Sequence, residues 1–349
     1  MDKVIKETIG VDLGDRRSSY CVLDQATGEV REEGQVESTP QAMGEFFARF
    51  PSGRAVLEAG GHSPWVSRIA AQRCAEALVA NPRALAFIYG NHRKSDRVDA
   101  RALAKVARVD TSLLSPVVHR SAQAQADLAL VRLRRALVEA RTKLINTLRG
   151  TIKSMGHRLP KRGAECVGED QLPEVPLELR QTVKPMLQSI DGLTTRIRTY
   201  DKRIEALSKK TYKPTAVLRQ VDGVGVLTAF AYVLTMEDPS RLRRSRDAGP
   251  YFGLSPRRDQ SGSVDKQLGI SKHGDGLVRT LLVQCAHRIL GPFGKDSALR
   301  RHGLALAARG GPAARKRAVI AVARKLAVLL HRLWTTGEAY APLRGAKSA

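Results

Sequence analysis

Residues 8–15 of the chain read TIGVDLGD, and residues 18–23 read SSYCVL. The first run is apolar up to Asp12 and then meets a glycine, as a strand does where the chain turns. The second run contains the aromatic and β-branched residues that strands favour. Together the two runs predict a β-hairpin that carries an acidic residue, Asp12, at the end of its first strand.

Further strands and helices follow this hairpin and predict an α/β domain over residues 1–110. A turn at Thr27-Gly28 leads to a third short strand, after which helices and strands alternate. The expected elements are a helix at residues 41–50, a strand at 55–59, a helix from Pro64, a strand at 77–80 and a helix at 95–106. Hairpins followed by alternation suggest a ribonuclease H-like fold.

Residues 111–211 are predicted to form long helices. In residues 120–156, which hold no proline, apolar residues recur at intervals of seven, flanked by leucines. A link that contains Pro and Gly (156–176) precedes a second repeat of this kind. The first repeat comprises Val131, Val138, Ile145 and Ile152, and the second comprises Val183, Ile190, Ile197 and Ile204, with Met186, Leu193, Tyr200 and Leu207 at its other position.

The second repeat is typical of a coiled-coil seam, although Pro185 is expected to delay the start of its helix. Two arrangements remain open. The two long helices pair with each other in an intramolecular hairpin, or they form a coiled coil that joins two chains, and both arrangements can hold together.

Residues 212–349 are predicted to form a basic, mostly helical domain. The run VDGVGVLTA (221–229) resembles a helix-hairpin-helix turn, in which Gly223 and Gly225 would let backbone amides approach a phosphate. A plain helix-capping turn explains the same residues. A long helix is predicted at residues 313–333, and the tail from Ala339 is expected to be frayed.

The net charge of +25 indicates a polyanionic partner, because Lys and Arg that neutralise phosphates release counterions. This charge is unevenly distributed. Residues 1–110 hold 16 Lys and Arg against 15 Asp and Glu, whereas residues 111–349 hold 43 against 19. The first domain can therefore hold a cluster of acidic groups, while the positive charge of the rest of the chain binds the polyanion. A basic architectural or ribosomal protein is the simpler alternative.

No stretch approaches twenty apolar residues, and the N-terminus lacks the apolar run of a secretory signal. These features predict a cytoplasmic protein that does not bind membranes. The four cysteines, Cys21, Cys74, Cys166 and Cys285, have no C-x-x-C spacing, and the histidines have no zinc-type spacing. We expect reduced structural thiols.

Four acidic residues stand where a metal site could form. Asp12 ends an apolar strand, and Glu58 repeats this pattern in VLEAGG (56–61). Asp96 and Asp99, three apart, share one face of a helix start. Each acid alone has an ordinary explanation, such as capping a turn or favouring a helix N-terminus. Four converging carboxylates would repel one another without a cation, so their convergence would favour bound Mg²⁺.

A segment rich in Gly, Ser and basic residues lies between residues 251 and 282. It shows little hydrophobic periodicity before Leu277, so we expect a loop that could wrap phosphates. Ser261, followed by Gly262, is a candidate nucleophile in it. An ordinary basic loop accounts for the composition equally well.

These motifs resemble the DEDD transposases of bacterial insertion sequences, which are related to Piv-type DNA invertases, and the resemblance spans nearly the whole chain. GVDLG, VLEAGG and KSDRVDARALA resemble the family's RuvC-like domain. VDGVGVLTA, FGLSPR, QSG and GISKHGD resemble its C-terminal transposase domain.

The resemblance implies a DNA recombinase in which Ser261 attacks a phosphodiester to form a phosphoserine link. Asp12, Glu58, Asp96 and Asp99 would hold the assisting Mg²⁺ or Mn²⁺. Ser255, Ser263 and Ser271 are weaker candidates for the nucleophile, and Lys272, His273 and Arg279 are candidate phosphate contacts. The implied partners are donor and target DNA, a structured bridge RNA, and further copies of the chain in dimers and tetramers, with the site shared between subunits.

Three other functions compete with this one. A Holliday-junction resolvase would need the four acids but not Ser261. An actin-like ATPase or sugar kinase also has a strand of the GVDLGD kind, but it needs a second α/β lobe where this sequence predicts long helices. A nucleic-acid-binding scaffold would use the acids only structurally.

Overall fold

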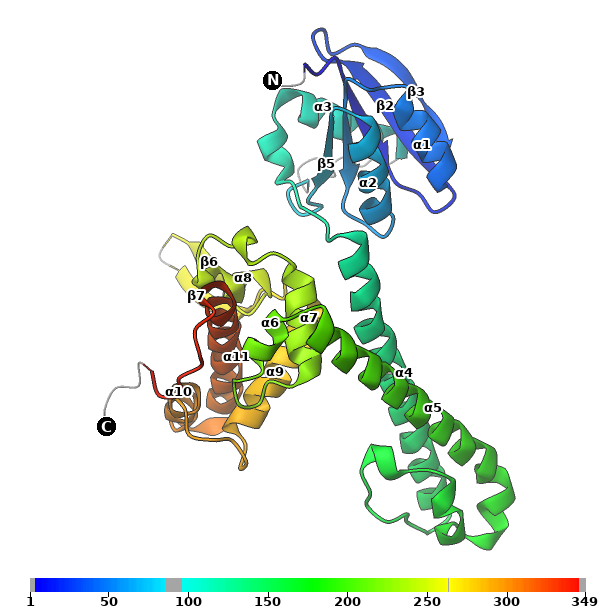
Figure 1. Ribbon diagram of the computed structural model, residues 1–349, viewed down its shortest axis with the longest axis vertical. Helices are drawn as coiled ribbons and strands as arrows, with labels where there is room; N and C mark the ends of the chain where they lie inside the picture. The colour runs from blue at the N-terminus through cyan, green and yellow to red at the C-terminus, as the bar shows by residue number, and fades with distance from the viewer. Residues whose placement is uncertain (1–3, 86–95, 263, 345–349) are drawn as a thin grey trace. The chain divides into compact units, whose positions relative to one another are not determined.

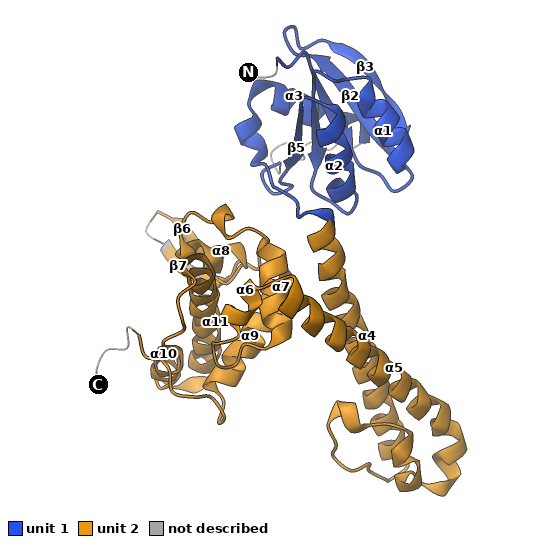
Figure 2. Cartoon of the chain, viewed as in Figure 1, with its two compact units in different colours: residues 1–122 blue, residues 123–349 orange. Residues whose placement is uncertain are grey.

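The computed structural model describes residues 4–85, 96–262 and 264–344. The chain divides into two compact units, Met1–Ala122 and Gln123–Ala349 (Figure 2). Within the described residues, no helix is long and apolar enough to cross a membrane.

Unit 1 is built on a mixed five-stranded sheet in the order β3-β2-β1-β4-β5 (Figure 1). β1 pairs antiparallel with β2 and parallel with β4, so it lies at the centre of the sheet. The strands are β1 (Glu7–Asp12), β2 (Arg17–Asp24), β3 (Val30–Glu37), β4 (Gly53–Glu58) and β5 (Glu76–Ala80). This sheet confirms the predicted α/β class and each predicted strand. The kinship with ribonuclease H stays a prediction.

Helices cover both faces of this sheet because alternate strand residues are apolar on both sides. Ile9 and Val11 of β1 share a core with Phe47 of α1 (Pro40–Ala48) and Val66 of α2 (Ser63–Arg73). The opposite face packs on α3 (Asp96–Val109), whose Ala100, Leu103, Ala104 and Ala107 are buried. Gly10 therefore faces α3, whereas Ile9 and Val11 face α1 and α2.

In unit 2 the two long helices pack along each other (Figure 1). They are α4 (Ala122–Ser154) and α5 (Leu177–Lys210), and the segment between them holds the short turns η2 (Ala164–Cys166) and η3 (Glu169–Glu174). The residues of the second predicted repeat, Val183, Ile190, Ile197 and Ile204, are all buried. The intramolecular pairing is thus confirmed, and the coiled coil between chains stays a prediction.

Pro185 does not delay α5, which begins at Leu177 and continues through the proline. That expectation was wrong. Pro185 and Gln181, whose carbonyl would have received the missing hydrogen bond, are both exposed. Water can therefore satisfy the carbonyl that the proline leaves without a donor.

The remainder of unit 2 is a helical bundle around α7 (Val226–Met236), in which Thr228 to Met236 are all buried. The Tyr232 hydroxyl donates a 2.7 Å hydrogen bond to the Ala327 carbonyl of α11. The other elements are α6 (Pro214–Leu218), η4 (Pro239–Arg241), η5 (Ser245–Asp247), α8 (Ala248–Tyr251), β6 (Pro256–Ser261), β7 (Val264–Ile270), α9 (Gly276–Leu290), α10 (Ala298–Ala307) and α11 (Gly311–Thr336), with η1 (Thr111–Leu114) in unit 1.

Two expectations for this bundle need correction. The predicted loop between residues 251 and 282 contains an antiparallel hairpin, β6–β7. The tail is held rather than frayed over its first residues: the Tyr340 amide donates to Gln220 Oε1 at 2.8 Å, and the Pro342 carbonyl accepts from the Ala298 amide at 2.8 Å. Both features depend on hydrogen bonds of the backbone, to other backbone groups and to the Gln220 side chain, and such bonds leave no apolar periodicity in the sequence.

Candidate functional site

Asp12 and Glu58 end adjacent parallel strands. Val11 pairs with Leu57 in the β1–β4 register, so the two acids that follow are neighbours at the carboxyl edge of the sheet. Side chains two apart on a strand project to the same face. Asp12 therefore shares a face with Gly10, and Glu58 shares it with Val56, which packs against Leu103 of α3.

The other two acids lie on α3, the helix that covers this face. It crosses β1 so closely that a Cβ atom on Gly10 would stand 2.1 Å from the Ala100 carbonyl oxygen. Asp96 and Asp99 form the first turn of α3, immediately before this crossing. Asp12 and Glu58 thus end adjacent strands on the face that α3 covers, and Asp96 and Asp99 lie in the first turn of that helix.

The side chains do not form a closed metal cage. Among the described residues, no group of three or more His, Cys, Asp or Glu side chains could hold a metal ion. Asp96 is exposed, and the other three acids are partly exposed. The donor set nevertheless suits Mg²⁺ or Mn²⁺, which prefer carboxylate oxygens. Convergence of the four carboxylates on one ion stays a prediction.

The turn after Glu58 is held by a serine that the sequence analysis missed. The Gly60 amide donates to the buried Ser63 Oγ at 2.9 Å, and this hydroxyl also lies 2.9 Å from the Gly60 carbonyl and from His119 Nε2. Burial, followed by the charges of Arg68 and Arg120, lowers the pKa of His119. A neutral His119 thus supports the turn next to Glu58. Ser63 and His119 are 56 residues apart, so no sequence spacing signals the pair.

In unit 2, two of the predicted motifs cross each other. The Lys272 amide donates to the Gly253 carbonyl at 3.1 Å, and the Ser271 amide donates to the Ser255 carbonyl at 2.9 Å. Gly253 has φ +67°, and a Cβ atom there would stand 2.2 Å from the His273 carbonyl oxygen. FGLSPR and GISKHGD therefore form one rigid crossing at the base of the β6–β7 hairpin.

Ser261 is the last residue of β6 and is exposed, and Gly262 after it has φ +55°. The strands are joined further back by an exposed ion pair, in which Arg258 Nε lies 2.7 Å from Asp265 Oδ1. Because every residue of β6 is exposed, the Ser261 hydroxyl can be approached by a large substrate.

The predicted phosphate contacts have different surroundings. Arg279 Nη1 donates to the carbonyls of Phe252 and His273, at 3.2 and 2.8 Å, so Arg279 helps to hold the motif crossing. Lys272 and His273 are exposed on that crossing, and Lys272 has φ +57°. Contact of any of these residues with phosphate stays a prediction.

The predicted helix-hairpin-helix glycines lie between α6 and α7. Gly223 has φ +85°, and a Cβ atom there would stand 3.1 Å from Ile289 of α9. Gly225 is the N-cap of α7 and makes no side-chain capping bond. The turn therefore presents backbone at a helix N-terminus, as either predicted explanation requires.

An α/β unit with acids at adjacent strand ends is followed along the chain by a basic helical unit, a combination that suits a protein that works on nucleic acid. Comparison with known families makes this specific. A DEDD transposase model of the IS110 type matches residues 9–156, and the model described as "Transposase IS116/IS110/IS902 family" matches residues 215–299. The first match includes all four acids, and the second includes Ser261.

Proteins with similar sequences are also described as transposases. The transposase for insertion sequence element IS1111A of Coxiella burnetii is 28% identical over 345 residues, 95% of this chain and 90% of that protein. A probable family 20 transposase of Pseudomonas aeruginosa is 27% identical over 254 residues, 70% of this chain and 74% of its own. The chain is an insertion-sequence transposase of the IS110/IS116 family.

Proposed function

We propose that this transposase cuts and rejoins DNA with Ser261 as its nucleophile, assisted by divalent metal at the four carboxylates and guided by a structured bridge RNA. The observation that supports the serine most directly is its position. Ser261 is exposed at the end of β6, next to a positive-φ glycine, on a hairpin based on the crossing of two motifs.

The serine step exchanges one phosphate ester for another. Ser261 Oγ loses its proton and bonds to phosphorus, while the bond from phosphorus to a sugar oxygen breaks and that oxygen gains a proton. Rejoining reverses the exchange with a different sugar hydroxyl. No external energy source is needed, because the number of phosphate ester bonds is unchanged.

Asp12, Glu58, Asp96 and Asp99 would hold Mg²⁺ or Mn²⁺ through carboxylate oxygens. Bound metal supplies charge stabilisation to the phosphoryl group as it is transferred. The chain's own contribution is positional: the β1–β4 register holds Asp12 beside Glu58, and α3, which begins with Asp96 and Asp99, covers the same face of the sheet. The RuvC-like, ribonuclease H-like character of unit 1 is part of this proposal.

The proposed partners are donor DNA, target DNA and the bridge RNA, and the proposed assembly is a dimer that forms a tetramer. The excess of 24 positive charges in residues 111–349 supports a nucleic-acid partner. In the assembly, the carboxylates of one subunit would serve Ser261 of another.

The decisive experiment uses full-length chain with Ser261→Ala, and with Ser263→Ala as a control two residues further on. A supercoiled plasmid with element ends, the bridge RNA and Mg²⁺ are added, and reactions are stopped with denaturant. Wild type and Ser263→Ala should yield a covalent protein–DNA species, while Ser261→Ala should yield none. Undiminished cleavage by Ser261→Ala, with no adduct in any sample, would instead establish a resolvase-like nuclease.

A further inference from the structure

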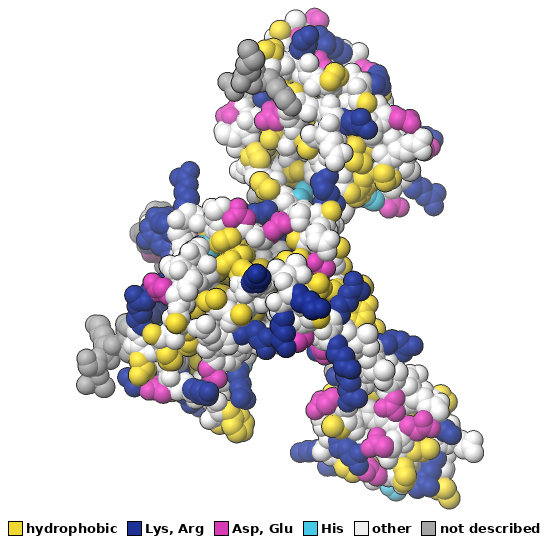
Figure 3. Space-filling view, in the orientation of Figure 1, with side chains coloured by type: hydrophobic (Ala, Val, Ile, Leu, Met, Phe, Trp, Pro, Cys, Tyr) yellow, Lys and Arg dark blue, Asp and Glu magenta, His cyan; other side chains and the backbone are white. Residues whose placement is uncertain are grey.

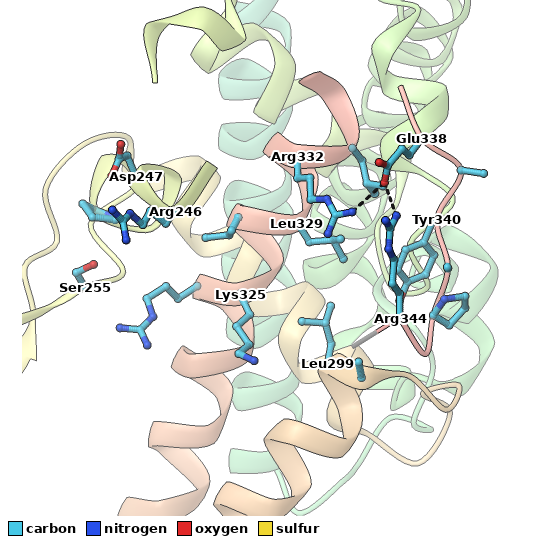
Figure 4. Close-up of a pocket in the computed structure, with 18 residues that line it drawn as sticks. Arg246, Asp247, Ser255, Leu299, Lys325, Leu329, Arg332, Glu338, Tyr340 and Arg344 are labelled. Carbon is cyan, nitrogen blue, oxygen red and sulfur yellow. Dashed lines mark hydrogen bonds and ion pairs between the residues drawn. The ribbon is translucent and has the colours of Figure 1, made fainter. Parts of the chain in front are cut away.

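A cavity of about 660 Å³ opens in unit 2, between α11 and the C-terminal segment. In Figure 4, Arg246 and Ser255 lie on one side of α11, and Glu338, Tyr340 and Arg344 lie on the other. Leu329 and Lys325 of α11 stand between the two sides. All of the α11 and tail residues that line the cavity follow residue 299, where the matched transposase segment ends.

The lining combines positive charge with an apolar wall. Its five basic side chains exceed its two acidic ones by three, and leucines, valine and proline supply apolar surface. The charged members are Arg246, Arg324, Lys325, Arg332, Arg344, Asp247 and Glu338. Ligand pockets of this size are usually apolar with a few placed polar groups. A ligand that fits this cavity therefore carries both an anionic group and an apolar ring or chain.

The two sides differ in how their charge is balanced. Glu338 accepts from Arg332 Nη2 at 2.9 Å and from Arg344 Nη1 at 2.5 Å, so both cations on one side have an acidic partner (Figure 4). On the other side, no ion pair to Arg246, Arg324 or Lys325 occurs within the described part of the chain. Burial, and then the charges of Lys325 and Arg324, lower the pKa of His302. Asp247, the acidic residue on this side, lies 3.6 Å from Arg244, which is not part of the lining. Three cations therefore make the second side the place for an anion.

The cavity also lies within reach of the proposed nucleophile. Ser255 lines it, and β6 leads from there to Ser261 six residues on, a span of at most about 20 Å for extended chain. A nucleic-acid strand at Ser261 can thus extend to the cavity. An anion joined to a flat apolar ring is the chemistry of a nucleotide, and the ring reaches such a wall only when it has left the base stack.

We propose that this cavity binds one unpaired nucleotide of a nucleic-acid strand, with phosphate at Arg246, Arg324 and Lys325 and the base against Leu329 and Tyr340. This inference rests on the proposed function, because it assumes a strand engaged by the hairpin. It adds a site for which neither the carboxylates nor the serine is needed.

Binding is measured with full-length Ser261→Ala chain, which removes chemistry from the assay. The probe is a short fluorescent single-stranded DNA, followed by anisotropy over a salt series. Arg324→Ala/Lys325→Ala removes two cavity cations, and Lys316→Ala/Arg317→Ala removes the same charge from exposed positions of α11 outside the cavity. The slope of log K against log salt should fall in magnitude by up to about 0.7 for the cavity variant, the value for the one phosphate that the site would hold.

The control should leave both affinity and slope as in the parent. Equal losses in the two variants would show general attraction by charge and overturn the site. An equal loss with fully paired duplex would overturn the requirement for an unpaired base. RNA of the same sequence, deoxyadenosine monophosphate and inorganic phosphate are compared in parallel. Tight binding of the mononucleotide without strand binding would also overturn the proposal.

A crosslinking arm remains informative if a variant is poorly folded. The parent chain is irradiated with a strand that contains 4-thiothymidine, and the attached peptide is identified by mass spectrometry. Attachment within residues 324–344 is expected, and attachment confined to other segments would overturn the site. Failure of Ser261 as the nucleophile would alter neither readout, so the two proposals fail separately.

Discussion

Gly10 of β1 and Ala100 of α3 approach so closely that a Cβ atom on Gly10 would stand 2.1 Å from the Ala100 carbonyl oxygen. Gly10→Ala should therefore push α3 away from the sheet and lower the free energy of unfolding of unit 1 by about 1–3 kcal/mol. Urea unfolding is followed by Trp65 fluorescence in a Trp334→Phe background, which leaves one tryptophan in the chain.

Gly44→Ala is the matched control, since α1 has open space around that position. It should stabilise unit 1 by up to about 1 kcal/mol, the usual gain for Ala over Gly inside a helix. Wild-type stability in Gly10→Ala would contradict the close approach of strand and helix.

Metal affinity should depend on the sheet-edge acids. Asp12→Asn and Glu58→Gln each remove a negative charge from the face covered by α3, and each should weaken Mn²⁺ binding to the full chain by at least about tenfold. Electron paramagnetic resonance of free Mn²⁺ measures the affinity. Glu45→Gln on α1, which makes a hydrogen bond only to Gln41 among the described residues, should leave it unchanged. Equal Mn²⁺ affinities in all variants would show that Asp12 and Glu58 do not bind the metal.

His119 should make unit 1 less stable in acid. Its pKa in the folded chain lies below the ordinary value of 6.5, chiefly because the ring is buried. As pH falls below about 6.5, the unfolded chain takes up this proton more readily than the folded chain, so folding stability decreases. His119→Gln should flatten this dependence between pH 5 and pH 7 in the Trp65 assay. If the folding stability of His119→Gln depended on pH as steeply as that of the wild type, His119 would not be the source of this dependence.

The motif crossing should be intolerant of a side chain at Gly253, where φ is +67° and the His273 backbone leaves no space. Gly253→Ala should cost about 1–3 kcal/mol through overpacking and strain and reduce transposition sharply. Gly269→Ala, at a position with open space, should keep both stability and activity. Plasmid excision assays measure the activity of the two variants, and thermal melting measures their stability.

Sequence patterns predicted the strands of unit 1 because apolar periodicity reports burial directly. The same patterns placed Asp12 and Glu58 at strand ends, and the observed register makes these residues neighbours. The pairing of Ser63 with His119 escaped prediction, since it depends on tertiary contact between residues 56 apart. The cavity beside α11 could not be predicted for a similar reason, because its lining comes from four separate segments of the sequence.

The hairpin of Ser261 was missed for a different physical reason. Every residue of β6 is exposed, so the strand has no apolar alternation to reveal it. Its strand pairing consists of backbone hydrogen bonds, and its base is fixed by Gly253 and Gly274, whose positive φ angles resemble those of any turn.

That exposure bears on the timing of catalysis. A two-stranded hairpin by itself is marginally stable in water, and β6 buries no side chain that would add to it. Amide protons of β6 should thus exchange with solvent far sooner than those of the buried helix α7. Protection should rise when nucleic acid lies along the strand. If Ser261 is the nucleophile as proposed, it would then be fully ordered only when nucleic acid is bound, and the chain alone would cut DNA poorly.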